Sequence, residues 1–380
     1  MTDTDRVVVV GAGVAGLAAA HALVPDHDVV VLDRGTVGGG ATSRASGMIS
    51  LALEPLPPAV RDHAWSFFHD FDGTGVFDFF EQPTVRLVPA GDGGHAEATA
   101  AESEAVRFHT PEDLHELHPG TFDDLSGYDG ALEYLDHTGF LDPEDYGATL
   151  RHEADVAGAR IYRDRTVTGL RIEDDEVTGV ETDLGPVDAD YVVVATGWRT
   201  REFLADHVEL PVRPMRWNAL VVDPGREVPP TEPMGSDPER RVYWRPTRHG
   251  DLLVGGNEHL VDDPESATMR VDESFVDLVQ SDLADVLAGA DGEIRRTDCC
   301  PGADTASPDG LPIVDAPAET PDGLVVATGF HGRGVMLSPV TGAAVRAHVA
   351  DEDPGFALDR FALDRFTHRS PDFDYVSHWD

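Results

Sequence analysis

The feature that most constrains the fold is a glycine-rich turn between a short strand and a helix near the start of the chain. Residues 6–10 are a valine-rich run typical of a buried parallel strand, and the residues that follow have a helical pattern. At the junction, Gly11, Gly13 and Gly16 have the spacing G-x-G-x-x-G, and Asp33 ends the next apolar run. This context predicts a βαβ unit that binds a dinucleotide.

Each glycine of this turn has a separate physical role. Gly11 permits the tight turn, Gly13 lets the backbone approach a pyrophosphate, and Gly16 lets the helix pack closely on the sheet. The helix begins with unpaired amides, so we expect those of Val14 and Ala15 to face the phosphates. The aspartate at the end of the second strand is expected to accept hydrogen bonds from an adenosine ribose.

Two later segments favour FAD over NAD as the dinucleotide. Residues 192–197 and 324–329 are each an apolar run that ends in Ala-Thr-Gly. A glycine at a strand end lets the backbone come close to a flat ligand. A ligand held by segments from both ends of the chain must be long, which suits FAD. A helix that starts at Ser338 beside the flavin would stabilise its anionic reduced form.

The pattern along the chain predicts an α/β protein with a discontinuous, Rossmann-like FAD-binding domain. An inserted α+β substrate domain, built on a mostly antiparallel sheet, interrupts it. Residues 88–104 are predicted to be a surface loop and residues 224–240 an exposed excursion, because both are rich in loop-forming residues. We assign residues 1–80, 141–210 and 300–380 to the FAD-binding domain, and residues 81–140 and 211–299 to the substrate domain.

Charge is the most unusual feature of the composition. The chain has 71 Asp and Glu against 28 Lys and Arg, all of the latter arginine, and its net charge is −43. The acids are spread along the chain, which predicts a hydrated surface adapted to the salt-rich cytoplasm of a halophile. Nucleic acid is disfavoured as a partner, because its phosphates would be repelled. The acidic start and the lack of a long apolar run predict a cytoplasmic protein with no transmembrane segment.

The two cysteines, Cys299 and Cys300, are adjacent, so they are poorly placed to pair with each other. We expect both to be small buried residues. The sequence has no spacing typical of a metal site, and no metal is expected.

Taken together, these motifs resemble the superfamily of D-amino-acid oxidase, glycine oxidase, sarcosine oxidase and D-amino-acid dehydrogenases. The resemblance spans nearly the whole chain and includes the run Ser-Pro-Asp-Gly-Leu-Pro at residues 307–312. Besides the glycine turn, it places cofactor-binding positions at Asp33, Arg34, Ala41, Thr42, Ser43, Arg44, Gly47, Met48, Val167, Thr196, Gly197, Trp198, Gly329, His331, Gly332, Arg333, Gly334 and Val335.

The resemblance implies oxidation of a small amine or amino acid of the D-amino acid, glycine or sarcosine type. A hydride would pass to flavin N5, and the resulting imine would be hydrolysed. The electron acceptor would be oxygen, a quinone or a redox protein. Two alternatives stay open: an FAD-dependent 2-hydroxy-acid dehydrogenase on the same scaffold, and the flavin-bearing subunit of a multi-subunit oxidoreductase.

Three residues are candidates for catalysis or substrate binding. Arg216 is expected to hold a substrate carboxylate, since a guanidinium binds carboxylates with two parallel hydrogen bonds. Tyr243 resembles the family's substrate-lid tyrosine, and Arg245 is a further candidate cation. The structural alternatives are surface arginines paired with acids and an aromatic residue of a strand.

Four positions depart from the family pattern on the substrate side of the flavin. Asp304 stands where the family often has a basic residue, and Met48 where some dehydrogenases have a histidine. Met336 stands where sarcosine oxidases have a lysine. The chain has no lysine to assist oxygen beside the flavin, which slightly favours a dehydrogenase, although a histidine or an arginine could replace the lysine. Gly302 falls nearest to their flavin-linking cysteine, so we expect FAD to be bound without a covalent link.

Overall fold

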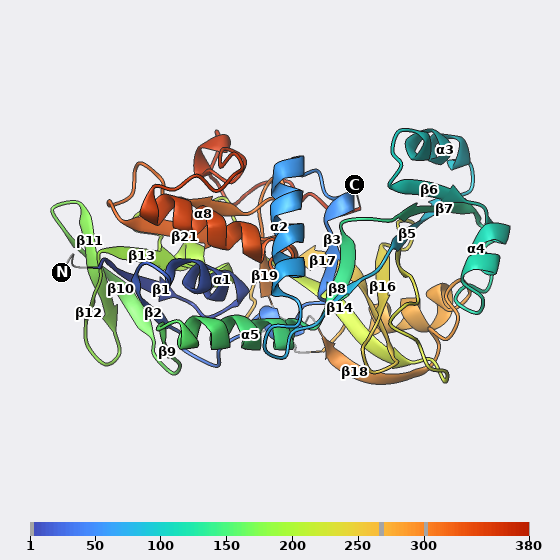
Figure 1. Cartoon of the computed structure of the whole chain (residues 1–380), viewed down its shortest axis with the longest axis horizontal. Helices are drawn as coiled ribbons and strands as arrows, with labels where there is room; N and C mark the ends of the chain where they lie inside the picture. The colour runs from blue at the N-terminus through green and yellow to red at the C-terminus, as the bar shows by residue number, and fades with distance from the viewer. Residues whose placement is uncertain (1–3, 266–269, 300–302, 380) are drawn as a thin grey trace.

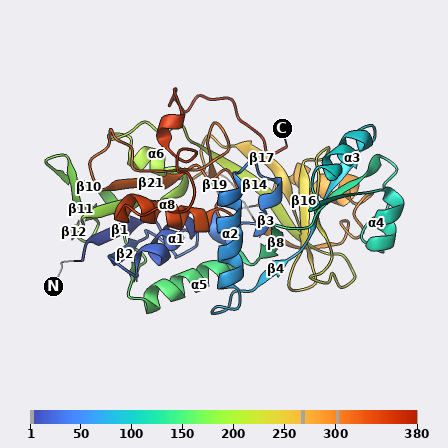
Figure 2. The same cartoon turned by 45° about the horizontal axis from the view of Figure 1, so that its top comes forward.

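The computed structural model describes residues 4–265, 270–299 and 303–379. It is an elongated α/β structure in which two large sheets lie at opposite ends, and Figures 1 and 2 show the helices α1, α5 and α8 gathered at one end. This arrangement confirms the predicted fold class. None of the helices in the described ranges is long and apolar enough to span a bilayer.

The first large sheet has six strands in the order β20-β21-β13-β1-β2-β9. Its central strands are parallel, and only β20 at the edge runs antiparallel to its neighbour β21. Its strands are β1 (Arg6–Val10), β2 (Asp28–Leu32), β9 (Arg160–Tyr162), β13 (Tyr191–Val194), β20 (Ile313–Asp315) and β21 (Leu324–Thr328).

Both faces of this sheet are covered, which explains why its strands are continuously apolar. Val7 and Val9 pack into a core shared with the helices on one face, while Val8 and Val10 pack into a second core on the other. The helices are α1 (Val14–Leu23), α2 (Pro58–Phe71), α5 (Pro143–Val156) and α8 (Ser338–Ala350). The opposite face packs against a small sheet of β10 (Val167–Glu173), β11 (Glu176–Thr182) and β12 (Val187–Asp188).

Local sequence signals set the helix ends. Asp142 caps α5, because its carboxylate accepts from the amides of Glu144 at 2.9 Å and Asp145 at 3.2 Å, and Pro143 occupies the first helical position. Helices α1 and α8 approach closely at Gly342, where a Cβ would lie 2.8 Å from the carbonyl oxygen of Ala18. Helix α1 begins at Val14, three residues after the glycine turn starts at Gly11.

The second large sheet has nine strands and is mostly antiparallel, with one parallel pair between β5 and β15. Its main order is β18-β14-β17-β16-β15-β5-β7-β6, and β19 also pairs with β14. The strands are β5 (Thr84–Pro89), β6 (Val106–His109), β7 (Tyr128–Tyr134), β14 (Arg213–Asp223), β15 (Met234–Asp237), β16 (Val242–Pro246), β17 (Leu252–Leu260), β18 (Glu293–Cys299) and β19 (Ala303–Ala306).

Smaller elements surround this sheet and link it to the first one. A three-stranded sheet of β4 (Phe79–Glu81), β8 (Thr138–Leu141) and β3 (Met48–Ser50) also belongs to the fold. The remaining α-helices are α3 (Gly93–Ala101), α4 (Pro111–Leu117), α6 (Thr200–Phe203) and α7 (Glu273–Asp277), and α7 continues as a π-helical segment, Leu278–Leu283.

Two predictions in this half of the chain are wrong. Residues 88–104 are not a loop, because β5 continues to Pro89 and α3 follows. Residues 224–240 are not wholly exposed, because β15 lies buried between β5 and β16 in the middle of the sheet. The domain boundaries stay a prediction. We note that β19 lies in the segment assigned to the FAD-binding domain, yet it pairs with β14 of the second sheet.

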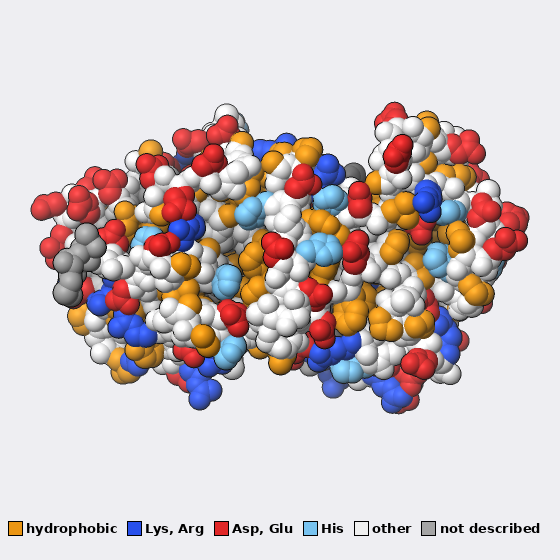
Figure 3. Space-filling model, in the orientation of Figure 1, with side chains coloured by type: hydrophobic (Ala, Val, Ile, Leu, Met, Phe, Trp, Pro, Cys, Tyr) orange, Lys and Arg blue, Asp and Glu red, His pale blue; other side chains and the backbone are white. Residues whose placement is uncertain are grey.

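The surface of the molecule is rich in acidic side chains, in agreement with the net charge of −43. Figure 3 shows acidic side chains spread over the whole visible face, with arginines scattered among them. Several arginines form exposed ion pairs, such as Arg346, which contacts Asp26 at 2.5 Å and Glu352 at 2.7 Å.

Candidate functional site

The predicted dinucleotide motif lies at the carboxyl edge of the parallel sheet. Strands β1, β2, β13 and β21 all end there, and Gly11, Asp33, Ala195 and Gly329 follow these strands directly. The amides of Gly11 and Ala195 donate to the last carbonyls of the neighbouring strands, each at 2.8 Å. Ligands of open α/β sheets bind in the crevice outside this edge.

The three glycines of the turn differ in what surrounds them. A Cβ on Gly11, whose φ is +105°, would lie 2.3 Å from the carbonyl oxygen of Ala195, and one on Gly16 would lie 2.0 Å from that of Gly11. A Cβ on Gly13 would meet only Thr42 Oγ1, at an ordinary 3.5 Å. The protein's own packing therefore requires the outer two glycines. The middle one leaves its backbone open, as a pyrophosphate close to the helix would need.

Asp33 shapes this turn from the second strand. Its carboxylate accepts from the amide of Ala12 at 2.7 Å and from that of Gly35 at 2.8 Å. The amide of Arg165 donates to the Asp33 carbonyl at 2.8 Å. Val167, a predicted cofactor-binding residue two positions further on, begins β10 beside the same edge. Arg34 is exposed next to it. The edge therefore fits the adenosine half of FAD.

The segment after the second strand closes over the helix N-terminus. The amide of Val14, the first residue of α1, donates to Thr42 Oγ1 at 2.9 Å, while Ala15 is buried in the next position. Gly47 has a φ of +67°, and a Cβ there would lie 2.1 Å from the carbonyl oxygen of Leu141. Ser43 lies on the same loop and is half-buried.

A cavity of about 460 Å³ lies between this loop and the second large sheet. Seven of the predicted site residues line it, and they come from segments far apart in the sequence. They are Ala41, Arg44, Met48, Tyr243, His331, Gly332 and Arg333. The structure thus brings together the loop after the second strand, the loop after β21 and one strand of the large sheet.

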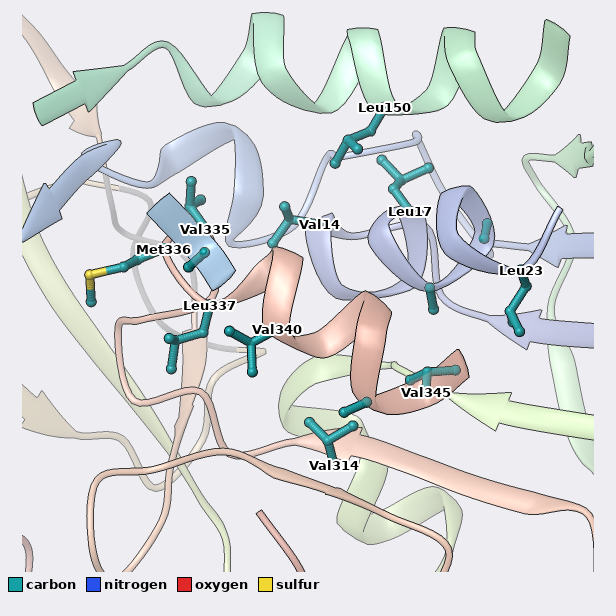
Figure 4. Packing of buried hydrophobic residues seen from close by; sticks show 14 of the residues in the cluster. Val14, Leu17, Leu23, Leu150, Val314, Val335, Met336, Leu337, Val340 and Val345 are labelled. Atoms are coloured by element: carbon teal, nitrogen blue, oxygen red, sulfur yellow. The ribbon is translucent and has the colours of Figure 1, made fainter. Parts of the chain in front are cut away.

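The other predicted cofactor residues lie at the strand ends or in the core. Thr196, Gly197 and Trp198 follow β13, where Thr328 Oγ1 donates to the Gly197 carbonyl at 3.2 Å. Gly329 and Gly334 flank the loop that enters the cavity. Val335 points into the core between α1 and α8, as Figure 4 shows.

His331 is a buried, neutral residue of the cavity wall. Its side chain accepts from the Ser307 amide through Nδ1 at 3.3 Å and donates to the Val376 carbonyl through Nε2 at 2.8 Å. Burial, and next the positive charge of Arg333, lower the pKa of His331 to about 4. At neutral pH it therefore carries no charge, and its two ring nitrogens have defined roles.

Arg333 forms a buried ion pair with Glu54, a residue that the sequence motifs did not single out. Its Nε donates to Glu54 Oε2 at 2.6 Å, and its Nη1 donates to the Gly310 carbonyl at 2.8 Å. The Arg333 and Glu54 side chains are only 10% and 7% exposed. Because Glu54 lies in a proline-flanked segment that carries no motif, only the structure reveals it. The pair fixes the loop after β21 at the cavity.

Of the three predicted catalytic residues, only Tyr243 is among the described residues that line the cavity. Arg216 Nη2 donates to the Arg270 carbonyl at 2.6 Å and lies 3.7 Å from Asp272. Arg245 donates to the Ser46 carbonyl at 2.5 Å and to the Pro246 carbonyl at 2.8 Å. The roles assigned to these two arginines stay predictions, and the contacts described here are structural.

Besides Met48, two more of the departures from the family pattern lie in the cavity wall. Asp304 accepts from the Gly332 amide at 2.6 Å, and burial raises the pKa of its carboxyl. Met336 is buried, and its sulfur accepts from the Ser50 amide at 3.4 Å. Cys299 ends β18, whereas Cys300 and Gly302 lie outside the described residues, so the prediction about covalent attachment is untouched by the structure.

The segment 376–379 at the end of the chain forms another wall of the cavity. Glu258 on β17 accepts from three groups of this segment: Ser377 Oγ, the His378 amide at 3.2 Å and Trp379 Nε1 at 2.9 Å. His331 adds the hydrogen bond to the Val376 carbonyl. In Figures 1 and 2 the end of the chain accordingly lies beside β17. No motif in this segment pointed to such a role.

The crevice at the edge of the parallel sheet has the features of a dinucleotide site, and a cavity joins it to the large mixed sheet. These two features together are typical of flavin-binding oxidoreductases. Comparison with known families agrees, because the sequence matches the family of FAD dependent oxidoreductases (DAO) over residues 6–347. The chain belongs to this family and is an FAD-dependent oxidoreductase.

Individual relatives cover nearly the whole chain at low identity. The glycine oxidase of Geobacillus kaustophilus is 27% identical over 96% of this chain and 98% of its own length. Its crystal structure superposes with a TM-score of 0.82, covering 96% of this chain and all of that one. The sarcosine oxidase subunit beta of an Arthrobacter species is 26% identical over 95% of this chain and 90% of its own. The L-proline dehydrogenase of P. horikoshii shares the fold, with a TM-score of 0.81 at 21% identity over 96% of this chain and 98% of that one.

Proposed function

We propose that this enzyme oxidises a small amine or amino acid of the glycine, sarcosine or D-amino acid type in the cytoplasm. The observation that carries the proposal is the cavity itself. It joins the loops assigned to the flavin to a wall of the large sheet that presents Tyr243. The near full-length similarity to a glycine oxidase and to a sarcosine oxidase subunit supports this substrate class.

In this proposal the residues at the sheet edge hold the cofactor. The turn from Gly11 to Gly16 faces the pyrophosphate, Asp33 the ribose, and the loops around Arg44 and His331 the flavin end. Bound FAD supplies the hydride acceptor for the α C–H bond of the substrate. The protein's own part is to orient a neutral amine in the cavity and to exclude water from it.

The electron acceptor after flavin reduction is oxygen, a quinone or a redox protein. Met336 lies at the position where sarcosine oxidases carry a lysine, so no ammonium assists oxygen there. This favours a dehydrogenase that passes its electrons to another acceptor. A second candidate function is that of a flavin-bearing subunit, supported by the similarity to the sarcosine oxidase subunit beta.

An anaerobic screen of flavin bleaching tests the proposal directly. The purified holoenzyme is mixed with glycine, sarcosine, D-amino acids, matched amines and 2-hydroxy acids. Bleaching by amino acids, and not by hydroxy acids, is the expected result. Bleaching by hydroxy acids alone would replace the proposal with the 2-hydroxy-acid alternative, and activity that needs a co-purified chain would show a subunit role.

A further inference from the structure

A row of polar side chains crosses the large sheet on the face that looks into the cavity. Ser236 on β15 is the direct neighbour of Arg86 on the parallel strand β5 and of Tyr243 on the antiparallel strand β16. Side chains at such paired positions project from the same face. All three residues line the cavity, together with Trp217.

Arg86 is the unusual member of this row because it lacks a counter-ion. It is half-buried, and burial lowers the pKa of its guanidinium. Among the described residues it has neither a hydrogen-bond nor an ion-pair partner, and its electrostatic neighbour is the Tyr134 phenol. The chain has 71 acidic residues and 28 arginines, so an arginine that is not paired with a carboxylate is unexpected.

The architecture of the sheet keeps the neighbouring carboxylate away from Arg86. On β7, the residue opposite Arg86 is Leu132, which belongs to an apolar cluster. The next residue, Glu133, is paired with Val85, points to the other face and contacts His109 at 2.8 Å. The guanidinium therefore has an apolar neighbour on one side and the cavity on the other.

The carboxylates that line the cavity are engaged elsewhere. Glu54 binds Arg333, and Asp309 binds Arg365 at 2.8 Å. Asp304 accepts from the Gly332 amide. None of these carboxylates neutralises the charge of Arg86. An anionic ligand in the cavity would therefore supply the counter-ion of Arg86.

Besides Arg86, two cavity-lining residues carry buried donors that have no partner among the described residues. Ser236 is only 4% exposed, and its Oγ makes no hydrogen bond within the described structure. The buried Nε1 of Trp217 is likewise unpaired there. Buried polar atoms are rarely left unsatisfied unless a ligand or water completes them. A guanidinium next to a hydroxyl is the donor set that binds a carboxylate.

We propose that Arg86 and Ser236 bind the carboxylate of an amino-acid substrate, the role that Arg216 was expected to have. The proposal rests on the proposed function and names the part of the cavity that selects amino acids over amines. The flavin-side residues Ala41 and Met48 come from the other wall, so the α-carbon of a bound amino acid would lie between the two.

The test compares Arg86→Gln with Arg107→Gln in the holoenzyme. Arg107 lies on β6, which β7 separates from the strand of Arg86. It is exposed and is paired with Glu133 on the opposite face, so this control removes the same charge outside the cavity. Dissociation constants for acetate and acetamide are read from the flavin absorbance spectrum and from tryptophan fluorescence. Arg86→Gln should weaken acetate binding by roughly 10- to 100-fold. Acetamide binding, and both ligands in Arg107→Gln, should be unchanged.

Ser236→Ala is the second variant. Its hydroxyl has no internal partner, so its loss should leave the melting temperature unchanged or raise it, while acetate binding weakens severalfold. Equal acetate affinity in Arg86→Gln and Arg107→Gln, or no acetate binding by the unaltered enzyme, would overturn the proposal. These binding measurements need no turnover, so they are independent of the bleaching screen. If amino acids bleach the flavin of Arg86→Gln as well as that of Arg107→Gln, the proposed function stands and this inference fails.

Discussion

The three glycines of the first turn belong to one motif but serve two purposes, the packing of the fold and the binding of the cofactor. Gly11 and Gly16 are needed because protein atoms would lie within 2.3 Å of any added Cβ. Gly13 has no such restriction, since its added Cβ would meet Thr42 Oγ1 only at 3.5 Å. Gly11 and Gly16 therefore support the fold, and Gly13 is available to the cofactor.

This difference predicts opposite behaviour for two matched substitutions. Gly13→Ala should leave the melting temperature of the apoprotein nearly unchanged and weaken FAD binding, because the methyl group would intrude on the pyrophosphate. Gly16→Ala should destabilise the apoprotein by about 2–4 kcal/mol, since the backbone must shift to relieve the clash. Thermal unfolding of both apoproteins and FAD titration by fluorescence would check this. A large loss of apoprotein stability in Gly13→Ala would contradict it.

His331 predicts a dependence of stability on pH. Its pKa is about 4 in the folded protein, below its ordinary value of 6.5. Below about pH 6.5 the unfolded chain takes up a proton that the folded protein excludes. The stabilisation is therefore complete above pH 6.5 and is lost as the pH falls towards 4, with a total on the order of 3 kcal/mol.

His331→Gln removes the titrating group and isolates this contribution from those of the other histidines. Between pH 6.5 and pH 4, the unfolding free energy of the variant should fall less steeply than that of the unaltered protein. These two pH values are the pKa of His331 in the unfolded chain and in the folded protein. Denaturant unfolding at a series of pH values measures both slopes. Parallel slopes would show that His331 does not titrate differently in the two states.

Among the elements, the segment 376–379 has most of its described hydrogen bonds with one side chain, Glu258. Glu258 binds three groups of that segment, so Glu258→Ala should release it from the cavity wall. The bound flavin should then become several times more accessible to iodide quenching, and proteases should cut the segment faster. Glu97→Ala, at an exposed position of α3, is the control. Unchanged quenching in Glu258→Ala would mean that other contacts suffice to hold the segment.

Elements with local signals could be predicted from sequence, and elements defined by distant pairing could not. The glycine turn, the Asp142 cap and the start of α8 at Ser338 all follow from nearby residues. Strand β15 was missed because four residues, Met234–Asp237, in a proline-rich stretch show no period of their own. They are buried only because β5 and β16 flank them.

The same distinction explains the candidate site. The meeting of the motif-bearing loops at one sheet edge was predictable, because loops after parallel strands converge there, and their contacts with flavin stay a prediction. The substrate side depends on register between strands far apart in sequence, which placed Arg86 beside Ser236. Sequence alone therefore favoured Arg216, an arginine on a strand, although its described contacts are with Arg270 and Asp272.

At the scale of the whole molecule, the net charge of −43 predicts a dependence on salt. At about 1 M salt the screening length is about 3 Å, whereas at about 0.01 M it reaches about 30 Å. Acidic side chains spread as in Figure 3 would then repel one another across a domain. Dialysis from molar potassium chloride into dilute buffer should lower the melting temperature and raise free-flavin fluorescence together. If both stay constant, the acidic surface is not an adaptation to salt.

The order of strands in the parallel sheet also has a consequence for biosynthesis. Strand β1 is made first, its neighbour β13 lies near the middle of the sequence, and the next strand β21 emerges from the ribosome only after most of the chain. Until β21 is made, the edge of β13 that β21 will cover stays open to other chains. We expect nascent chains stalled before Leu324 to bind chaperones and not FAD, and chains stalled beyond Ala350, once free of the exit tunnel, to bind it. FAD retention by the shorter chains would show that the cofactor site forms before the sheet is complete.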